Sequence, residues 1–287
     1  MDRRKLKNII ILILVLVNVF LITSLAQRRR AERESFERTA EQLTALFRQD
    51  GMTLDPRAIS RDRPPDGVAL TRDTLQEERA AAFLLGKAPA SSDQGGGIFH
   101  YAGQAGEAFF RSNGGFEASG VLAEDPEDFC RDFCREFSYE APVFQLDENG
   151  DGSAVVSALY GGLPVFNCTA LFTVEGGVLT AVSGTLLSRG GPSGGAEPPL
   201  SAAGALLAFQ RMRRESAAVV STVTDARLCY ELQTGGGVLS LAPVWRIVTD
   251  TEDYYVNCYT GAVSAGGGVS SPSGGRGVSP GGGRGSP

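Results

Sequence analysis

One uncharged stretch near the start of the chain limits the folds that are open to this protein. Residues 9–26 read IIILILVLVNVFLITSLA, and no charged residue lies between Lys7 and Arg28. As a helix this stretch would be about 30 Å long, which is the thickness of the hydrocarbon core of a bilayer. We therefore expect residues 9–26 to cross a membrane once, after a cytoplasmic N-terminus formed by residues 1–8.

A cleaved signal peptide would begin in the same way and is the alternative interpretation. The basic start, the apolar centre and the small residues Ser24 and Ala26 are typical of a cleavage site. The arginine triplet at 28–30 argues against cleavage, since dense positive charge is unusual at the start of a mature secreted chain. Both flanks are basic, so charge alone decides the topology only weakly. Because a large domain follows the span, we expect a single-pass cell-membrane protein with a cytoplasmic N-terminus and the bulk of the chain outside.

One face of the span has the composition of a contact with another membrane helix. Helices in lipid associate through close packing and occasional polar side chains. The predicted partner-facing residues are four positions at helical spacing, Val15, Asn18, Val19 and Ile22.

The charge of the region after the span excludes one class of ligand. Residues 31–265 carry 18 basic and 32 acidic side chains, a net charge of −14. A surface with this charge repels nucleic acid, anionic wall polymers and lipid headgroups. We therefore expect no nucleic-acid partner, which leaves proteins or small molecules.

No set of side chains in the sequence resembles a complete catalytic or metal-binding motif. His100 is the only histidine and lies in an apolar run, and no serine has the glycine neighbours of a nucleophile elbow. The segment DENGDG at 147–152 matches the first half of a calcium loop, but Ala158 stands where the last ligand, a glutamate, is required. A hairpin turn is the better interpretation of DENGDG, and a solvated turn that of the acidic cluster at 250–253. The sequence predicts no enzyme, catalytic residue, cofactor or metal.

The spacing of the cysteines favours buried free thiols. Cys130 and Cys134 would lie on one helix face, and no second closely spaced pair completes a zinc site. One disulfide or a metal site remains an open alternative. The five cysteines are Cys130, Cys134, Cys168, Cys229 and Cys258.

Helical and strand patterns follow one another in residues 27–120, the juxtamembrane helix and first α+β region. A helix over 28–49 has an apolar stripe at helical spacing, and we expect this stripe to pack on the first core. Alternatively, this helix is a spacer that lifts the domain off the membrane, or it pairs with a helix of a partner protein. A second helix is predicted after Asp73 and up to Gly86, a loop over 89–97, and then antiparallel strands. The residues of the stripe are Phe36, Ala40, Leu43, Leu46 and Phe47.

The following part of the chain repeats one order of elements. Residues 121–188 and 200–265 each begin with a helix and continue with antiparallel strands, and residues 189–199 link them. The two repeats share a landmark, LPVF at 163–166 and APVW at 242–245, whose prolines are expected at strand starts. Residues 266–287, rich in Gly, Ser and Pro, are expected to be a disordered tail. The predicted fold is α+β, a transmembrane helix followed by an ectodomain of duplicated helix-plus-antiparallel-sheet modules.

The end of the second repeat resembles a known family. The segment LAPVWRIVTDTEDYYVNCYTGAV resembles the end of the YycH/YycI family of membrane-anchored regulators, and the order of a short basic N-terminus, one span and an α+β ectodomain resembles its YycI branch. The same pattern occurs in PepSY-like modules. The residues that carry the resemblance are Pro243, Val244, Trp245, Tyr254, Tyr255, Val256, Asn257 and Gly261.

This resemblance implies a function. It implies a non-catalytic accessory regulator that contacts a WalK-like sensor histidine kinase of cell-wall homeostasis through its span and ectodomain, with a YycH-type paralogue as a further candidate partner. The chain departs from the family in its Gly- and Ser-rich tail and its five cysteines. The PepSY-like pattern implies an alternative, an extracytoplasmic inhibitor or chaperone of a secreted protease. An envelope hydrolase, the third hypothesis, would need His100 or an acid pair in a deep cleft.

Overall fold

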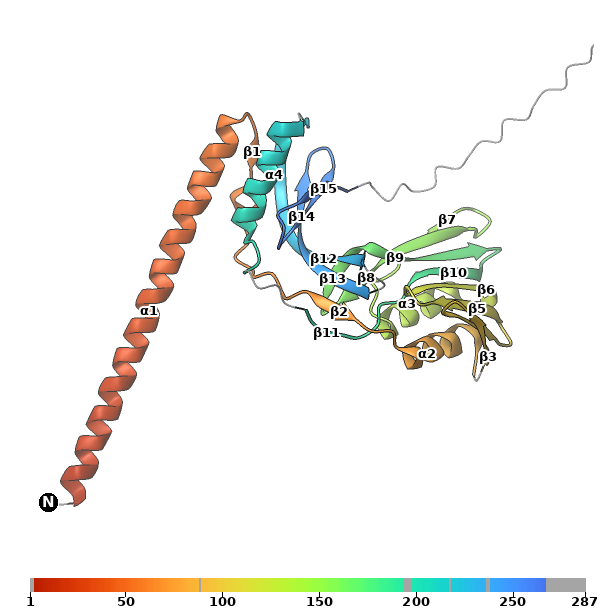
Figure 1. The fold of residues 1–287 in the computed structure, drawn as a ribbon, viewed down its shortest axis with the longest axis horizontal. Helices are drawn as coiled ribbons and strands as arrows, with labels where there is room; N and C mark the ends of the chain where they lie inside the picture. Colours follow the sequence, from red (N-terminus) through yellow and green to blue (C-terminus); the bar gives the residue numbers. More distant parts are fainter. Residues whose placement is uncertain (1–2, 88, 194–197, 217, 236–237, 267–287) are drawn as a thin grey trace, which may run out of the picture.

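The computed structural model describes residues 3–87, 89–193, 198–216, 218–235 and 238–266 (Figure 1). These residues form an α+β protein with a long N-terminal helix, as the sequence predicts. The predicted tail lies outside the described residues, except for Gly266. The helices are α1 (Arg3–Gln49), α2 (Thr74–Leu85), α3 (Pro126–Glu136) and α4 (Ala202–Ser216), with a 3-10 turn η1 (Pro56–Ala58). The strands are β1 (Thr53–Leu54), β2 (Val68–Leu70), β3 (Ala90–Gly95), β4 (Ile98–Ala102), β5 (Gly106–Arg111), β6 (Gly115–Ala123), β7 (Gln145–Leu146), β8 (Gly152–Tyr160), β9 (Leu163–Glu175), β10 (Val178–Thr185), β11 (Gly190–Pro192), β12 (Thr222–Gly235), β13 (Val238–Thr249), β14 (Asp253–Asn257) and β15 (Val263–Ala265). These strands join one large mixed sheet, with β12 parallel to β9 and to β1, instead of the purely antiparallel sheets that the sequence predicts.

Helix α1 is unbroken because its sequence contains no glycine or proline. It ends just before Gly51, whose φ of 73° is a left-handed conformation that glycine adopts at little cost. The large apolar side chains between Leu12 and Leu25 are exposed, for example Val15 at 53% and Ile22 at 67%. Among the described helices, α1 is the one that is long and apolar enough to cross a membrane. An apolar surface of this extent is stable only when lipid or a partner covers it.

The sheet carries two hydrophobic cores, each under its own helices. In the first core, α2 and α3 pack on strands β5 to β10. The ring of Phe133 on α3 lies 5.7 Å from Phe83 of α2 and 5.8 Å from Phe172 of β9. In the second core, α4 packs on β12, β13 and β14 through Leu206 and Phe209. The two parts form one sheet because β12 pairs with β9 in parallel, where Tyr230 meets a residue of β9.

The C-terminal end of α1 belongs to the second core. Leu43 and Phe47 are buried against α4 and the C-terminal strands, and Phe36 and Ala40 pack at the margin of the same core. The prediction that the stalk packs on the first core is therefore wrong. Residues 27–120 contribute to both cores, since α2 and β4 to β6 lie in the first.

A polar contact next to this core fixes α1 to α4. The carboxylate of Asp50 accepts two hydrogen bonds from the guanidinium of Arg214, at 2.6 and 2.8 Å, and one from the amide of Gln210. Arg213 also donates to the backbone carbonyl of Asp50 at 3.4 Å. The hydrogen bonds from Arg214 lower the pKa of Asp50 below its ordinary value of 3.8.

The contribution of this contact is expected to depend on pH. A carboxyl group whose pKa is lowered by folding stabilises the protein above its unfolded pKa, and this stabilisation is lost as the pH falls through the folded pKa. The variant Asp50→Asn should therefore melt below the wild type at pH 7, and the difference should close as the pH falls below about 3.8. Thermal melting of the detergent-solubilised chain at both pH values measures this. The matched control Glu37→Gln, on the exposed face of α1, should leave the melting temperature at pH 7 unchanged; an equal drop for both variants would contradict the assignment.

The order of elements in the two predicted repeats matches the sequence pattern. Helix α3 is followed by the antiparallel strands β8, β9 and β10, and α4 by β12, β13 and β14. Pro164 is the second residue of β9, as expected of a proline at a strand start. Pro243, however, lies inside β13. There the edge of β13 changes partner, since β2 pairs with residues 239–241 and β14 with residues 244–248, so an N–H facing this edge would have no ladder partner.

Two segments expected to be irregular form strands. Residues 90–95, within the predicted loop 89–97, make the edge strand β3, which pairs with β4. Residues 190–192, within the predicted linker 189–199, make β11, which pairs with β2. Every residue of β3 and β11 is exposed, so neither strand has the apolar alternation by which a sequence reveals a strand.

Candidate interaction surfaces

The predicted contact residues of the span lie on one exposed face of α1. Val15, Asn18, Val19 and Ile22 are all exposed, and no other described element covers them. Their spacing of three and four residues puts them on the same side of the helix. The hydroxyl of Thr23 donates to the carbonyls one turn earlier, at 2.9 and 3.0 Å, whereas the described residues offer the side chain of Asn18 no hydrogen bond. The amide of Asn18 is therefore the polar group in this face that another helix could satisfy.

The residues of the family-like motif on β13 are buried, and Trp245 lies in the second core. Val244, the neighbouring residue, is buried on the opposite face of the strand, and Pro243 belongs to the same buried run of β13. The indole Nε1 of Trp245 donates to the backbone carbonyl of Leu200 at 2.9 Å, just before the start of α4. Trp245 therefore joins the strand to the segment that leads into the helix, which is a structural role.

The motif residues of β14 alternate between the core and the other side of the sheet. Tyr254 and Val256 are buried in the second core, and the Tyr254 hydroxyl donates to a Glu252 carboxylate oxygen at 2.9 Å. Tyr255 points to the other face, where its ring stacks on Phe166 of β9 at a centroid distance of 3.7 Å. This stack links β14 to the first landmark, LPVF at 163–166, across the joint between the two parts of the sheet.

Asn257 and Gly261 build the turn after β14. The Asn257 side-chain oxygen accepts from the backbone N–H groups of Tyr259 and Thr260, at 2.9 and 3.0 Å. Gly261 has a φ of 68° and donates to the backbone carbonyl of Asn257 at 2.9 Å. A side-chain-capped turn closed by a left-handed glycine explains both residue types. The contacts of Trp245, Tyr254, Asn257 and Gly261 are thus contacts that form the fold.

The acidic cluster between β13 and β14 is used within the protein. Asp250 accepts from the backbone N–H groups of Ser221 and Thr222, and these hydrogen bonds lower the pKa of Asp250. Asp253 pairs with Arg246 at 2.5 Å. These contacts are those of a capped turn, the interpretation favoured from the sequence.

His100 and the segment DENGDG also have local partners. His100 lies in β4, its ring stacks on Phe109 at 4.6 Å, and its Nε2 lies 3.1 Å from a Glu107 carboxylate oxygen. One carboxylate oxygen of Asp147 accepts from the backbone N–H groups of Asn149 and Asp151, at 2.8 and 3.0 Å. DENGDG therefore connects β7 to β8 as a tight turn. In the part of the chain that the structure describes, no three side chains of the metal-binding types gather into a site.

All five cysteines are buried as free thiols. Burial raises the pKa of each thiol, to about 12 for Cys134, Cys168, Cys229 and Cys258. A thiol with a raised pKa is a poor nucleophile and a poor metal ligand at neutral pH.

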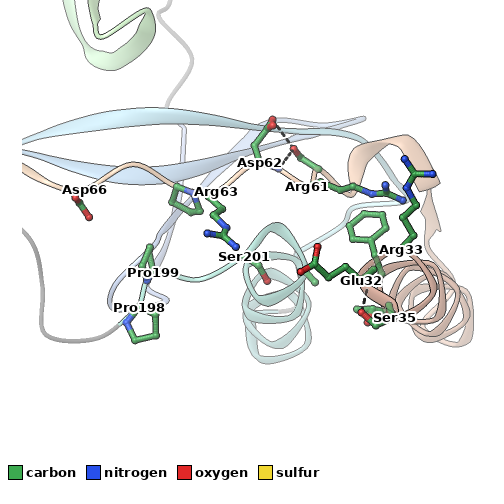
Figure 2. A pocket seen from close by; sticks show the side chains of 15 residues that line it. Glu32, Arg33, Ser35, Arg61, Asp62, Arg63, Asp66, Pro198, Pro199 and Ser201 are labelled. Carbon is green, nitrogen blue, oxygen red and sulfur yellow. Dashed lines mark hydrogen bonds between the residues drawn. The ribbon is translucent and has the colours of Figure 1, made fainter. Parts of the chain in front are cut away.

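A groove of about 980 Å³ lies where α1 leaves the predicted span and meets the body. Its walls are residues 32–39 of α1, the loop 60–66 and the segment 198–203 at the start of α4 (Figure 2). Phe36 contributes an apolar wall, and the guanidinium carbon of Arg61 lies 4.3 Å from the centroid of its ring. The sequence does not reveal this groove, because its three walls are far apart in the chain and none carries a recognisable motif.

The comparisons with known proteins assign no family. No family model and no curated protein matches this chain. Among solved structures, an uncharacterized protein from Eubacterium rectale ATCC 33656 is similar at 10% identity over 74% of this chain and 89% of that chain, with a TM-score of 0.41. YycH from Bacillus subtilis is similar at 9% identity over 67% of this chain, with a TM-score of 0.36, and this chain covers 53% of its length. Likenesses this low place the chain in no family.

Proposed function

We propose that this chain is a membrane-anchored, non-catalytic accessory regulator of a WalK-like sensor histidine kinase, acting through its span and its ectodomain. The observation that carries the proposal is helix α1, which continues from the exposed apolar span into the second core without a break. A helix without a hinge makes the orientation of the body depend on the position of the span. A change at a contact in the membrane can therefore alter a contact that the body makes outside the membrane, and the reverse.

The sequence gives the proposal its specific partner. The motif from Pro243 to Gly261 resembles the YycH/YycI family, and the order of helix and strands in the two repeats supports an ectodomain of duplicated PepSY-like modules. A YycH-type paralogue is the second partner that this resemblance suggests. The local contacts of His100, the acidic cluster and the buried thiols support a role without catalysis.

The mechanism we propose is a shift between conformations of the kinase. A regulator changes such an equilibrium only by the difference between its affinities for the two states. Single contacts between helices in lipid contribute about 0.6 kcal/mol on average, so the face that contains Asn18 would bias the helices of the kinase rather than lock them.

The proposal predicts which variant weakens the complex. Tagged full-length chain, purified from native membranes in mild detergent, is expected to carry a sensor histidine kinase, identified by mass spectrometry. Asn18→Leu should lower its recovery about threefold, the effect of losing one hydrogen bond between helices in lipid. Val17→Leu changes the opposite face of the helix and should leave the recovery unchanged.

Two outcomes would count against the kinase. Purification of the full chain without any kinase would overturn the proposed partner. Recovery of a secreted protease with the body alone would favour the inhibitor or chaperone of a protease, for which the PepSY-like pattern is the only support.

A further inference from the structure

The groove between α1, the loop 60–66 and the start of α4 holds three arginines without ion-pair partners. Arg33, Arg61 and Arg63 line it, and none forms an ion pair with another described residue. We propose that this groove binds the headgroup of a phospholipid of the type of phosphatidylethanolamine, from the membrane that α1 spans. The inference rests on the membrane anchoring of the proposed function and is independent of the kinase.

The groove lies at the height of the membrane surface. Glu32, the first residue of the groove, follows Ala26, the end of the predicted span, by six positions. This corresponds to about 9 Å of helix. The headgroup layer on each side of a bilayer is about 5–8 Å thick. The groove therefore begins where the headgroups end.

The direction of α4 turns the groove toward the membrane. Arg214, near the end of α4, binds Asp50 just after the end of α1, whereas Ser201 at the start of α4 lines the same groove as Glu32. The two helices consequently run in the same direction. The start of α4 and the loop 60–66 form the membrane-facing end of the second core.

The cations of the groove suit a phosphate group. Arg33 precedes Phe36 by one helical turn and lies on the same face of α1, and Arg61 covers the ring of Phe36. Arg33, Arg61 and Arg63 thus line the same groove, and the guanidinium of Arg61 lies over its aromatic wall. Guanidinium groups bind phosphate through paired hydrogen bonds.

The carboxylates of the groove suit an ammonium group. Glu32, Asp62 and Asp66 line the groove together with the arginines, so the lining is neutral overall. Asp62 accepts a hydrogen bond from the Ser60 hydroxyl at 2.7 Å, and Glu32 forms no ion pair with a described residue. Side chains of both signs in one groove match a headgroup that carries a phosphate and a primary ammonium.

The acidic composition of the chain does not extend to the groove lining. Three arginines there balance Glu32, Asp62 and Asp66, although residues 31–265 as a whole carry a net charge of −14. The net repulsion of headgroups by the acidic surface therefore does not come from the groove itself.

Photoreactive lipids test the inference. The full chain is reconstituted in nanodiscs that contain phosphatidylethanolamine with a photoreactive group in its headgroup, and labelled peptides are mapped by mass spectrometry. Wild type should be labelled in residues 60–66 and 198–203. The triple variant Arg33→Gln, Arg61→Gln, Arg63→Gln should lose this labelling about tenfold, the effect of losing one hydrogen bond between charged groups. The control Arg28→Gln, Arg30→Gln removes charge nearer the bilayer but outside the groove and should retain it.

Three results would overturn the inference. The first is labelling confined to residues before Glu32, and the second is unchanged labelling of the triple variant. The third is equal competition by soluble glycerophosphoethanolamine, which would identify a soluble ligand instead of a lipid. Equal melting temperatures of the variants verify their folding. Release of the chain from membranes by alkaline carbonate would refute the anchoring itself, whereas a retained chain without labelled groove peptides refutes only the groove.

Discussion

Replacing Phe47 by alanine is expected to lower the free energy of unfolding by about 3–5 kcal/mol, the usual cost of emptying a buried phenylalanine site. Phe47 is 0% exposed and is the last large side chain that α1 places in the second core. Its loss leaves a cavity between α1 and α4, and no neighbouring side chain of the remaining stripe is large enough to fill it. Urea denaturation in mild detergent measures the change. The fluorescence of Trp245, the single tryptophan, reports on the same core.

The matched control for Phe47→Ala is Phe20→Ala. Phe20 lies on the same helix and is 68% exposed, so detergent surrounds it in both states. Its replacement should change the free energy of unfolding by less than about 0.5 kcal/mol. Equal effects of the two replacements would show that α1 is not docked on the second core. If the chain acts on a kinase as proposed, Phe47→Ala should also weaken that regulation and leave recovery of the kinase through the span intact, because the body would be less firmly docked on α1.

Replacing Trp245 by alanine is expected to cost about 3–5 kcal/mol, because Trp245 fills the centre of the second core. Trp245→Phe retains most of the volume and loses the hydrogen bond to the carbonyl of Leu200. Leaving a buried acceptor without its donor costs about 1–3 kcal/mol. The free energy of unfolding should therefore decrease from the wild type to Trp245→Phe and further to Trp245→Ala, as measured by circular dichroism during urea denaturation.

The order of this series separates packing from hydrogen bonding. If phenylalanine cost as much as alanine, the hydrogen bond rather than the volume of the indole would hold the start of α4. If neither replacement lowered the stability, the motif residue Trp245 would not be a core residue. This test concerns the fold alone and does not depend on the proposed kinase.

The sequence predicted those parts of the fold that local patterns determine. The uncharged stretch 9–26 predicted a long apolar helix, and alternating strands with glycine-containing turns predicted β4, β5 and β6. The sequence predicted the start of α2 after Asp73, and the side chain of Asp73 accepts hydrogen bonds from the first turn of that helix. In each case the signal lies within a few residues of the feature it describes.

The parts that the sequence could not predict depend on contacts between distant segments. The apolar stripe of the stalk predicted packing but not its partner, because either core could have covered Leu43 and Phe47. Pro243 was expected at a strand start, and only the change of neighbours along β13 explains its place inside a strand. The groove needs three segments brought together by the second core. Strand β3 has no apolar side chain except Ala90, so no alternation reveals it, and only its pairing with β4 makes it a strand.

The docking of α1 also sets the order in which a growing chain can mature. Asp50 and Gln210 are 160 residues apart, so the end of α1 is synthesised long before its partners on α4. Most of the first core, by contrast, comes from the intervening residues and can assemble earlier. A chain interrupted before α4 would therefore leave Leu43 and Phe47 without the helix that covers them, and exposed apolar surface of this kind is prone to aggregation. Docking of α1 on the second core thus has to wait until α4 has been synthesised.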